Sequence, residues 1–232
     1  MDPEIGIWRA QLDLEPRRLA DLRSYLTPAE RAREVRFARP AGRACFAAAR
    51  GQLREVLAAR LGMDPGAVPI IAGAHGKPCL DPRASLDDVR FNLSHSGALG
   101  LVALAEGREI GVDVERDDAR RRLERVAARL MSPREIDAWR AIPGAEERVT
   151  AFVATWTRKE AYAKGIGEGL GVRLAEHELV AFGEAGWWAL RAGGRAVAGW
   201  LIADLDVQPG YAAALAVQCD AGRLPAIRVR SW

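Results

Sequence analysis

The sequence predicts an α+β protein built from two lobes. Strand-like and helix-like segments come in blocks: a strand, helices and strands, and then helices followed by a run of strands. At 232 residues the chain is long enough for one large domain, or for two lobes of about 100 to 130 residues each. We expect an N-terminal lobe over residues 1–107 and a C-terminal lobe over residues 108–232.

The N-terminal half alternates between strand and helix patterns. A Thr-Pro-Ala-Glu capping box at residues 27–30 marks a helix start, because the threonine and the glutamate each bond a free backbone N–H of the other. A glycine after a helical pattern marks a stop. The elements expected are a strand over 5–12, a helix from the capping box to about 37, a helix over 41–61 ended by Gly62, and strands over 89–93 and 99–105, with a turn at 106–109 that makes a hairpin with the next strand.

The C-terminal half begins with helices and ends with strands. A second capping box, Ser-Pro-Arg-Glu at residues 132–135, opens a short helix. The other expected elements are a strand over 110–115, helices over 117–130 and 146–164, and strands over 178–182, 187–191, 199–207, 211–218 and 226–230.

Composition excludes several classes of protein. Apolar residues make up 49% and charged residues 28% of the chain, and the apolar runs are too short and too interrupted to span a bilayer. The first residues lack the basic and apolar regions of a signal peptide, so we expect a cytoplasmic protein. Cys45, Cys79 and Cys219 are far apart without CxxC spacing, which indicates reduced packing residues and neither a zinc site nor a disulfide framework.

Positive charge is concentrated early in the chain. Between residues 17 and 60 there are eleven arginines against four acidic residues, a surplus of seven positive charges. Such a surplus suits phosphates, an acidic protein or nucleic acid as a partner. The alternative is that the arginines only keep two exposed helices in solution.

Two carboxylates stand two residues apart in an apolar segment. Side chains alternate along a strand, so Ile110, Val112 and Val114 should face the core. Asp113 and Glu115 should then share the other face, where they would repel each other unless water or a divalent cation screens them. The alternative is the solvated outer face of a half-buried strand.

The few lysines and one histidine are further candidates. Of 34 basic residues only Lys77, Lys159 and Lys164 are lysines, and in an arginine-rich chain a retained lysine suggests a position that needs a compact ammonium group. The turn around Lys77 is not a Walker loop, because proline follows where serine or threonine must bind magnesium. His95 follows a predicted strand, which suits contact with a ligand. For Lys77 the alternative is a surface lysine without a partner, and for His95 it is a histidine satisfied by neighbouring protein groups.

The long C-terminal helix carries a mixed pair of charges. Glu160 and Lys164 are four residues apart and therefore neighbours on one face, with Lys159 beside them. The alternative is a surface ion pair worth a few tenths of a kcal/mol. The glycines of residues 165–171 follow a helix instead of joining a strand to one, so a dinucleotide-binding loop is not expected.

Three segments, in this order and spacing, resemble the signature segments of the 4′-phosphopantetheinyl transferases. The Gly76-Lys77-Pro78 turn fits as well, and the length resembles the Sfp-type branch, in which two similar lobes form a pseudo-dimer with the active site between them. The resemblance covers residues 27–171 approximately and is general over the last strands. The three segments are Phe91-Asn92-Leu93-Ser94-His95-Ser96-Gly97, Ile110-Gly111-Val112-Asp113-Val114-Glu115 and Trp156-Thr157-Arg158-Lys159-Glu160-Ala161-Tyr162-Ala163-Lys164-Gly165.

The resemblance implies a set of site residues. Asp113, Glu115 and Glu160 would bind Mg²⁺ together with the diphosphate of coenzyme A. A basic residue of the family that contacts the nucleotide end aligns with Cys45, so we assign that contact to Arg43, with Arg39 as the alternative and Arg36 as a weaker candidate. The phosphates would be held by Lys77, His95, Lys159 and Lys164, with Ser94 close to them.

The resemblance also implies a reaction. The serine hydroxyl of an apo acyl or peptidyl carrier protein would attack the phosphorus bearing pantetheine, and 3′,5′-ADP would leave. Glu160, directly or through a metal-bound water, would take the serine proton, and Lys164 would stabilise charge on the departing phosphate. Polyketide, nonribosomal-peptide, fatty-acid and siderophore carriers all stay open, as does acceptance of acylated coenzyme A. We expect a monomer without membrane contact.

Two rival functions remain. The arginine-rich first lobe could be a nucleic-acid-binding module, which would explain the arginines but not the carboxylates. A magnesium-dependent coenzyme A hydrolase would use water in place of the carrier serine. Transfer is favoured over both because all three segments fit it together.

Overall fold

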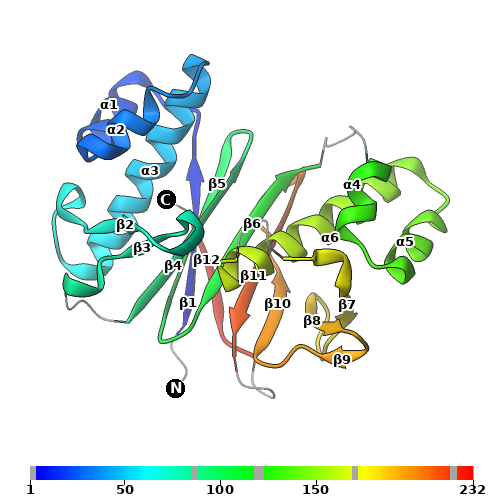
Figure 1. Cartoon of the computed structure of the whole chain (residues 1–232). Helices are drawn as coiled ribbons and strands as arrows, with labels where there is room; N and C mark the ends of the chain where they lie inside the picture. The colour runs from blue at the N-terminus through cyan, green and yellow to red at the C-terminus, as the bar shows by residue number, and fades with distance from the viewer. Residues whose placement is uncertain (1–3, 85–87, 118–122, 169–171, 220–223, 232) are drawn as a thin grey trace.

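The computed structural model describes residues 4–84, 88–117, 123–168, 172–219 and 224–231. It is an α+β molecule of two lobes that lie side by side, each with a sheet and with helices on the outer side of that sheet (Figure 1). Within the described ranges, no helix combines the length and apolar character that crossing a membrane requires.

The N-terminal lobe contains a four-stranded sheet in the order β12-β1-β5-β4. A small two-stranded sheet, β2 with β3, lies beside it, and the two ends of the chain meet where β1 pairs in parallel with β12. The elements of this lobe are β1 (Ile5–Gln11), α1 (Pro16–Ser24), α2 (Pro28–Glu34), α3 (Pro40–Leu61), β2 (Ile70–Ala72), β3 (Pro78–Leu80), β4 (Val89–Ser96), β5 (Leu99–Glu106) and β12 (Ile227–Ser231).

The C-terminal lobe has an antiparallel sheet in the order β6-β11-β10-β8-β7, with β9 paired to β8. The helix α6 lies across this sheet and contacts β6 and β11 (Figure 1). The elements are β6 (Ile110–Arg116), α4 (Leu123–Leu130), α5 (Pro133–Arg140), α6 (Ala145–Ile166), β7 (His177–Ala181), β8 (Trp187–Ala192), β9 (Arg195–Ala196), β10 (Trp200–Asp204) and β11 (Tyr211–Gln218).

The two lobes repeat the same helical unit. In each, a short helix opened by a Pro-containing capping box precedes a helix of 22 residues, and both capping boxes form as predicted. Both long helices end at a glycine in the left-handed conformation, Gly62 and Gly167, which is the usual way to satisfy the last carbonyls of a helix. This correspondence agrees with two similar lobes.

Alternation along the strands builds one core between the lobes. Ile110, Val112 and Val114 of β6 are fully buried, as predicted, and pack with the inward-facing residues of β1, β5, β10 and β11. The opposite faces of the two sheets are covered by α3 and α6. The carboxylates of β6 therefore lie beside a helix, and the expected alternative of a solvated outer face is wrong for Asp113, which is buried.

Several expected elements need correction. The hairpin of the fifth and sixth strands is wrong, because β5 pairs with β4 and β1 while β6 pairs with β11 in the other sheet. The strand β4 runs on to Ser96, so His95 lies within it. The helix α1 was not predicted, part of the helix expected over 117–130 falls outside the described residues, and β12 returns to the first lobe although it follows the expected boundary.

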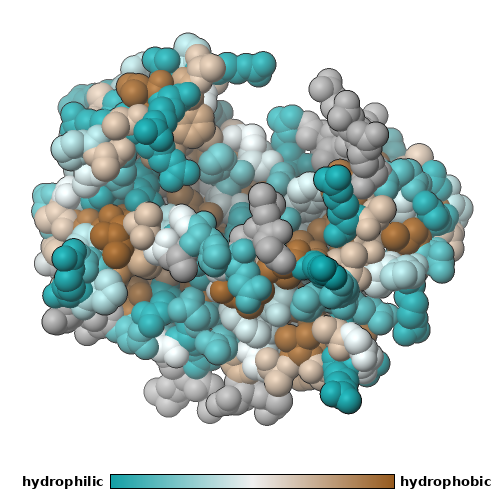
Figure 2. Space-filling model, in the orientation of Figure 1, coloured by the Kyte–Doolittle hydropathy of each residue, from teal (hydrophilic) through white to brown (hydrophobic). Residues whose placement is uncertain are grey.

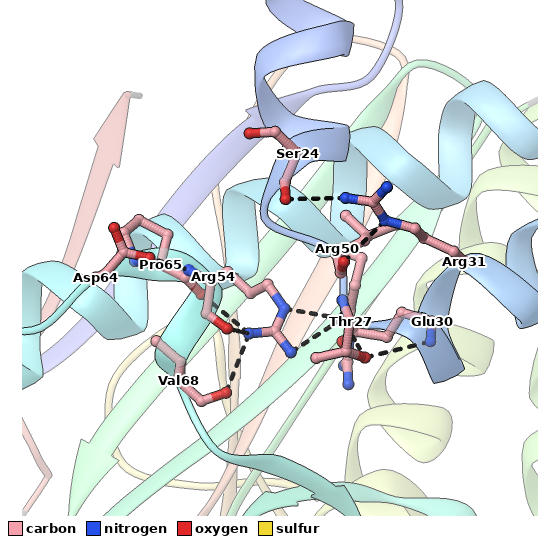
Figure 3. A network of polar contacts seen from close by, with 11 residues as sticks. Ser24, Thr27, Glu30, Arg31, Arg50, Arg54, Asp64, Pro65 and Val68 are labelled. Carbon is pink, nitrogen blue, oxygen red and sulfur yellow. Dashed lines mark hydrogen bonds and ion pairs between the residues drawn. The ribbon is translucent and has the colours of Figure 1, made fainter.

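A buried arginine fastens the helices of the first lobe (Figure 3). Arg54 of α3 is completely buried, and its Nε donates to Glu30 Oε2 of α2 at 2.9 Å. Its Nη1 donates to the carbonyl oxygens of Pro65 and Val68 at 2.9 and 3.0 Å. Arg50 also pairs with Glu30. Several of the clustered arginines are thus structural, which lowers the surface charge available for a nucleic acid.

We predict that Glu30→Ala lowers the free energy of unfolding at pH 7 by about 3 kcal/mol, because it leaves buried guanidinium groups unpaired. Burial raises the pKa of Glu30, but hydrogen bonds from Arg54 and Thr27 and the charge of Arg50 outweigh it and hold the pKa below its ordinary value. The carboxylate therefore stabilises the fold fully above that ordinary value, and this contribution is lost as pH falls through the lowered pKa.

Urea denaturation at several pH values measures the effect. Glu106→Ala is the control, since Glu106 pairs with Arg60 at a half-exposed position and should cost less than about 1 kcal/mol. Equal losses for both variants would contradict the assignment.

Candidate functional site

The helix α6 touches the strand β6 backbone to backbone. A Cβ added at Gly111 would lie 2.1 Å from the carbonyl oxygen of Ala161 and 2.2 Å from the amide nitrogen of Gly165, closer than atoms can approach. Only glycine fits at Gly111, because any side chain would push the helix away from the strand. This contact brings the faces that carry Glu160 and Lys164 next to Asp113.

Asp113 and Lys164 form the centre of the site. The Nζ of Lys164 donates to Asp113 Oδ1 at 2.6 Å and to Ser94 Oγ at 2.8 Å, and Ser94 Oγ donates to the same Asp113 Oδ1 at 2.8 Å. The three groups come from β6, α6 and β4, and so from both lobes. Burial raises the pKa of Asp113 more than the ammonium of Lys164 and the Ser94 hydrogen bond lower it.

The outer strand of the first lobe supports the carboxylate strand of the second. Asn92, Ser94 and Ser96 alternate along one face of β4, and Asn92 Oδ1 accepts the amide N–H of Val112 at 2.9 Å. Ser96 Oγ donates to Glu115 Oε2 at 2.8 Å. These side chains take the place of a backbone ladder between β4 and β6, which explains why the two sheets meet without merging.

Glu160 lies on the same cavity as Lys164. The cavity, of about 620 Å³, is lined by residues of both lobes, and the surface is notched where the lobes meet (Figure 2). Burial raises the pKa of Glu160, and the negative charges of Asp113 and Glu115 raise it further against the ammonium of Lys164. Burial likewise raises the pKa of Glu115. The negative charge of Asp113 thus disfavours the ionised forms of both Glu115 and Glu160.

The chemistry of these groups fits a divalent cation. Asp113 Oδ2 is buried and has no hydrogen-bond partner in the described structure, which is costly for a carboxylate oxygen unless something else binds it. A hard cation with oxygen ligands would satisfy it and remove the mutual repulsion of the three carboxylates. Among the described residues, however, no three His, Cys, Asp or Glu side chains already converge in metal-binding geometry, so the metal set stays a prediction.

Two lysines that are predicted to bind phosphate, Lys159 and Lys77, donate hydrogen bonds to other groups of the protein. Lys159 is completely buried, and its Nζ donates to Glu135 Oε2 at 2.6 Å and to the carbonyl oxygens of Leu130 and Leu174. Burial lowers the pKa of Lys159 despite the carboxylate of Glu135. Among the described residues, Lys159 does not line the cavity that Glu160 lines. The expectation that Lys159 holds a phosphate therefore finds no support in its contacts.

Lys77 also donates hydrogen bonds to other groups of the protein. Its Nζ donates to Glu109 Oε2 at 3.1 Å, to the Ile110 carbonyl at 3.3 Å and to the Gly165 carbonyl at 2.9 Å. The same side chain lines the cavity. The expectation that Lys77 holds a phosphate stays a prediction, because these contacts are those of the protein without coenzyme A.

His95 lies close to the centre, whereas Arg43 does not point toward it. Burial lowers the pKa of His95, and the charge of Lys164 lowers it further, which favours a neutral imidazole. Its Nδ1 lies 3.8 Å from Cys45 Sγ of α3. Arg43 is exposed, donates to the carbonyl of Phe37, and stands two residues from Cys45, on a different face of the helix.

Sequence patterns missed three supporting residues. Asn92 and Ser96 support β6 from a neighbouring strand, and no local spacing reveals such a contact between lobes. Gly111 was seen only as part of an apolar run, although a glycine inside a strand is itself a sign of close backbone approach.

We predict that Gly111→Ala lowers the free energy of unfolding by about 3 kcal/mol, since the new methyl group collides with the backbone of α6. Gly42→Ala in α3 is the matched control, because its Cβ would meet Phe37 at an ordinary 3.4 Å, and alanine is the better helix former. Denaturant midpoints of both variants measure the difference. A midpoint for Gly111→Ala equal to that of the unaltered chain would contradict the close contact.

The chain is similar in sequence to known 4′-phosphopantetheinyl transferases. The family model for the 4′-phosphopantetheinyl transferase superfamily matches residues 109–216. The 4′-phosphopantetheinyl transferase HetI of Nostoc sp. is 39% identical over 179 residues, which cover 77% of this chain and 75% of that protein. The 4′-phosphopantetheinyl transferase Sfp of Bacillus subtilis is 30% identical over 53% of this chain and 51% of that protein. A holo-(acyl-carrier-protein) synthase structure from Bacillus anthracis has a TM-score of 0.39 at 18% identity, over 49% of this chain and 96% of that one.

Proposed function

The chain belongs to the 4′-phosphopantetheinyl transferase superfamily, and we propose that it transfers the 4′-phosphopantetheine group of coenzyme A to a serine of an apo acyl or peptidyl carrier protein, with Mg²⁺ required and 3′,5′-ADP released. The observation that carries this proposal is the Asp113–Lys164–Ser94 cluster, which joins the two lobes beside a cavity that Glu160 also lines. Acidic and basic groups stand together there, as phosphoryl transfer requires.

The acidic side of the site would hold the metal. Asp113, Glu115 and Glu160 are the proposed ligands, and the unpartnered Oδ2 of Asp113 supports their assignment. When bound, Mg²⁺ would neutralise negative charge on the diphosphate oxygens of coenzyme A. Ser94 and Ser96 keep two of the carboxylates in position through their hydroxyl groups.

The basic side of the site would receive the phosphates. Lys164 supplies the ammonium at the centre, and its three N–H groups can turn from Asp113 toward a phosphate oxygen. His95, kept neutral by burial and by Lys164, can donate one N–H to a phosphate. A fixed cation at this place stabilises charge that develops on the departing phosphate.

Glu160 is the proposed general base. The serine oxygen forms a bond to the phosphorus that bears pantetheine, the bond from that phosphorus to the bridging oxygen of 3′,5′-ADP breaks, and the serine proton passes to Glu160, directly or through water. Glu160 lines the cavity, where its carboxylate can accept the proton of a hydroxyl group bound there. The cavity between the lobes gives coenzyme A and the carrier access to the same face of α6.

Intact-mass measurement of apo-carrier proteins incubated with coenzyme A tests the reaction. We predict a mass increase equal to one phosphopantetheine on at least one of a panel of polyketide, peptidyl and fatty-acid carriers. We expect no mass increase when EDTA is present during the incubation. Coenzyme A consumption without any carrier present would instead indicate hydrolysis, and salt-sensitive DNA retention without coenzyme A binding would indicate a nucleic-acid-binding module.

Substitution of the two central carboxylates tests their roles. We predict that Asp113→Asn and Glu160→Gln each lower kcat at least 100-fold, because the first removes the charge of a proposed metal ligand and the second removes the proposed base. Glu106→Gln, at a half-exposed position that does not line the cavity, should keep kcat within twofold. Thermal melting verifies that the variants are folded, and a folded Asp113→Asn with unaltered kcat would refute the metal assignment.

A further inference from the structure

The turn that presents Lys77 is rigid. The amide of Gly73 donates to the carbonyl of Lys77 at 2.8 Å, and the amide of Gly76 donates to the carbonyl of Gly73 at 3.1 Å. His75 within the turn has a φ of 53°, which a side-chain-bearing residue adopts only where the surroundings enforce it. The side chain of Lys77 therefore leaves the first lobe from a fixed point.

All three acceptors of the Lys77 ammonium belong to the second lobe or to the junction before it. They are Glu109 Oε2, the Ile110 carbonyl and the Gly165 carbonyl, at 3.1, 3.3 and 2.9 Å. An ammonium group has three N–H donors, so these contacts use its full capacity. Two of the acceptors are backbone carbonyls, which a phosphate cannot displace without leaving them unpaired.

One of these acceptors lies at the end of the helix that carries the reacting groups. Gly165 is in the last turn of α6, where carbonyl oxygens lack partners within the helix and where a cation is favoured by the helix dipole. It follows Lys164 directly, and its backbone also lies against Gly111. Lys77 thus holds down the end of α6 that places Lys164 on Asp113.

The same side chain separates two cavities. Lys77, Pro78 and Gly167 line both the cavity of about 620 Å³ beside Glu160 and a second cavity of about 720 Å³ on the other side. The carboxyl group of Glu109, which lines the second cavity, also accepts from Arg90 at 2.8 Å. Removal of the lysine side chain would leave the Gly165 carbonyl at the end of α6 without its hydrogen bond from the first lobe.

We infer that Lys77 is a positioning residue, an interlobe latch that fixes the C-terminal end of α6, and not a ligand of the coenzyme A phosphates. The inference rests on the proposed function where it concerns catalysis, because Lys164 acts on the departing phosphate only if α6 stays on β6. The latch itself is a property of the chain and can be measured without any reaction.

Lys77→Met is the first test, since it keeps the aliphatic stem and removes the ammonium group. The latch predicts at least a tenfold fall in kcat, a Kd for 3′,5′-ADP within twofold of the unaltered protein, and at least tenfold faster hydrogen–deuterium exchange of the amides of residues 164–167. Arg90→Met is the matched control, because it removes the other cation on Glu109 without touching α6, and it should leave that exchange unchanged.

Glu109→Gln is the second test and keeps Lys77 itself. Because this variant weakens the latch, we expect faster hydrogen–deuterium exchange of the amides of residues 164–167 and an unchanged Kd for 3′,5′-ADP. A tenfold rise of that Kd in Lys77→Met without faster exchange, or a tighter Kd in Glu109→Gln, would make Lys77 a phosphate ligand and overturn the inference. Unchanged exchange in both variants would also overturn it. If the unaltered protein transfers nothing, the proposed function fails, and the exchange measurement still decides on the latch.

Discussion

The site depends on the direct contact between the backbones of α6 and β6. Gly111 lets the helix lie closer to the strand than any side chain would permit, and Gly165 leaves room for the ring of Trp200 in β10 of the same sheet. At this separation Lys164 reaches Asp113 at 2.6 Å, and Glu160, one turn earlier, faces the same cavity. The apolar side of β6 is locked into the core between the lobes, so strand and helix form one rigid frame for the charged groups.

This frame holds the buried carboxylates of the site close to the ammonium group of Lys164. Burial raises the pKa of the three carboxylates, and the ammonium of Lys164 opposes this at each of them, together with a serine hydroxyl at Asp113 and at Glu115. The buried Oδ2 of Asp113 has no hydrogen bond in the described structure, which lowers the stability of the fold. Such a cost is typical of a binding site, where a ligand contacts the oxygen. This unpartnered oxygen is the feature on which the proposed binding of a cation rests.

Local patterns predicted the elements well and the contacts between lobes poorly. The capping boxes at Thr27 and Ser132 and the alternation in β6 are local, so the sequence alone located helix starts and the buried face. The strand that pairs with β6 is β11, which is far from it in the sequence. The predicted hairpin is wrong because side chains of β4, and not a backbone ladder with β5, contact β6. Lys77 and Lys159 fall in signature segments, yet only the folded chain reveals that their ammonium groups meet carbonyl oxygens.

A crystal structure of the protein with 3′,5′-ADP and Mg²⁺ would show whether β6 and α6 hold one metal ion between them. We expect a metal ion bound by Asp113, Glu115 and Glu160, a phosphate group on Lys164, and Lys77 still bonded to Gly165. A nucleotide held elsewhere, with Asp113 and Lys164 still closed on each other and no metal between the lobes, would contradict it.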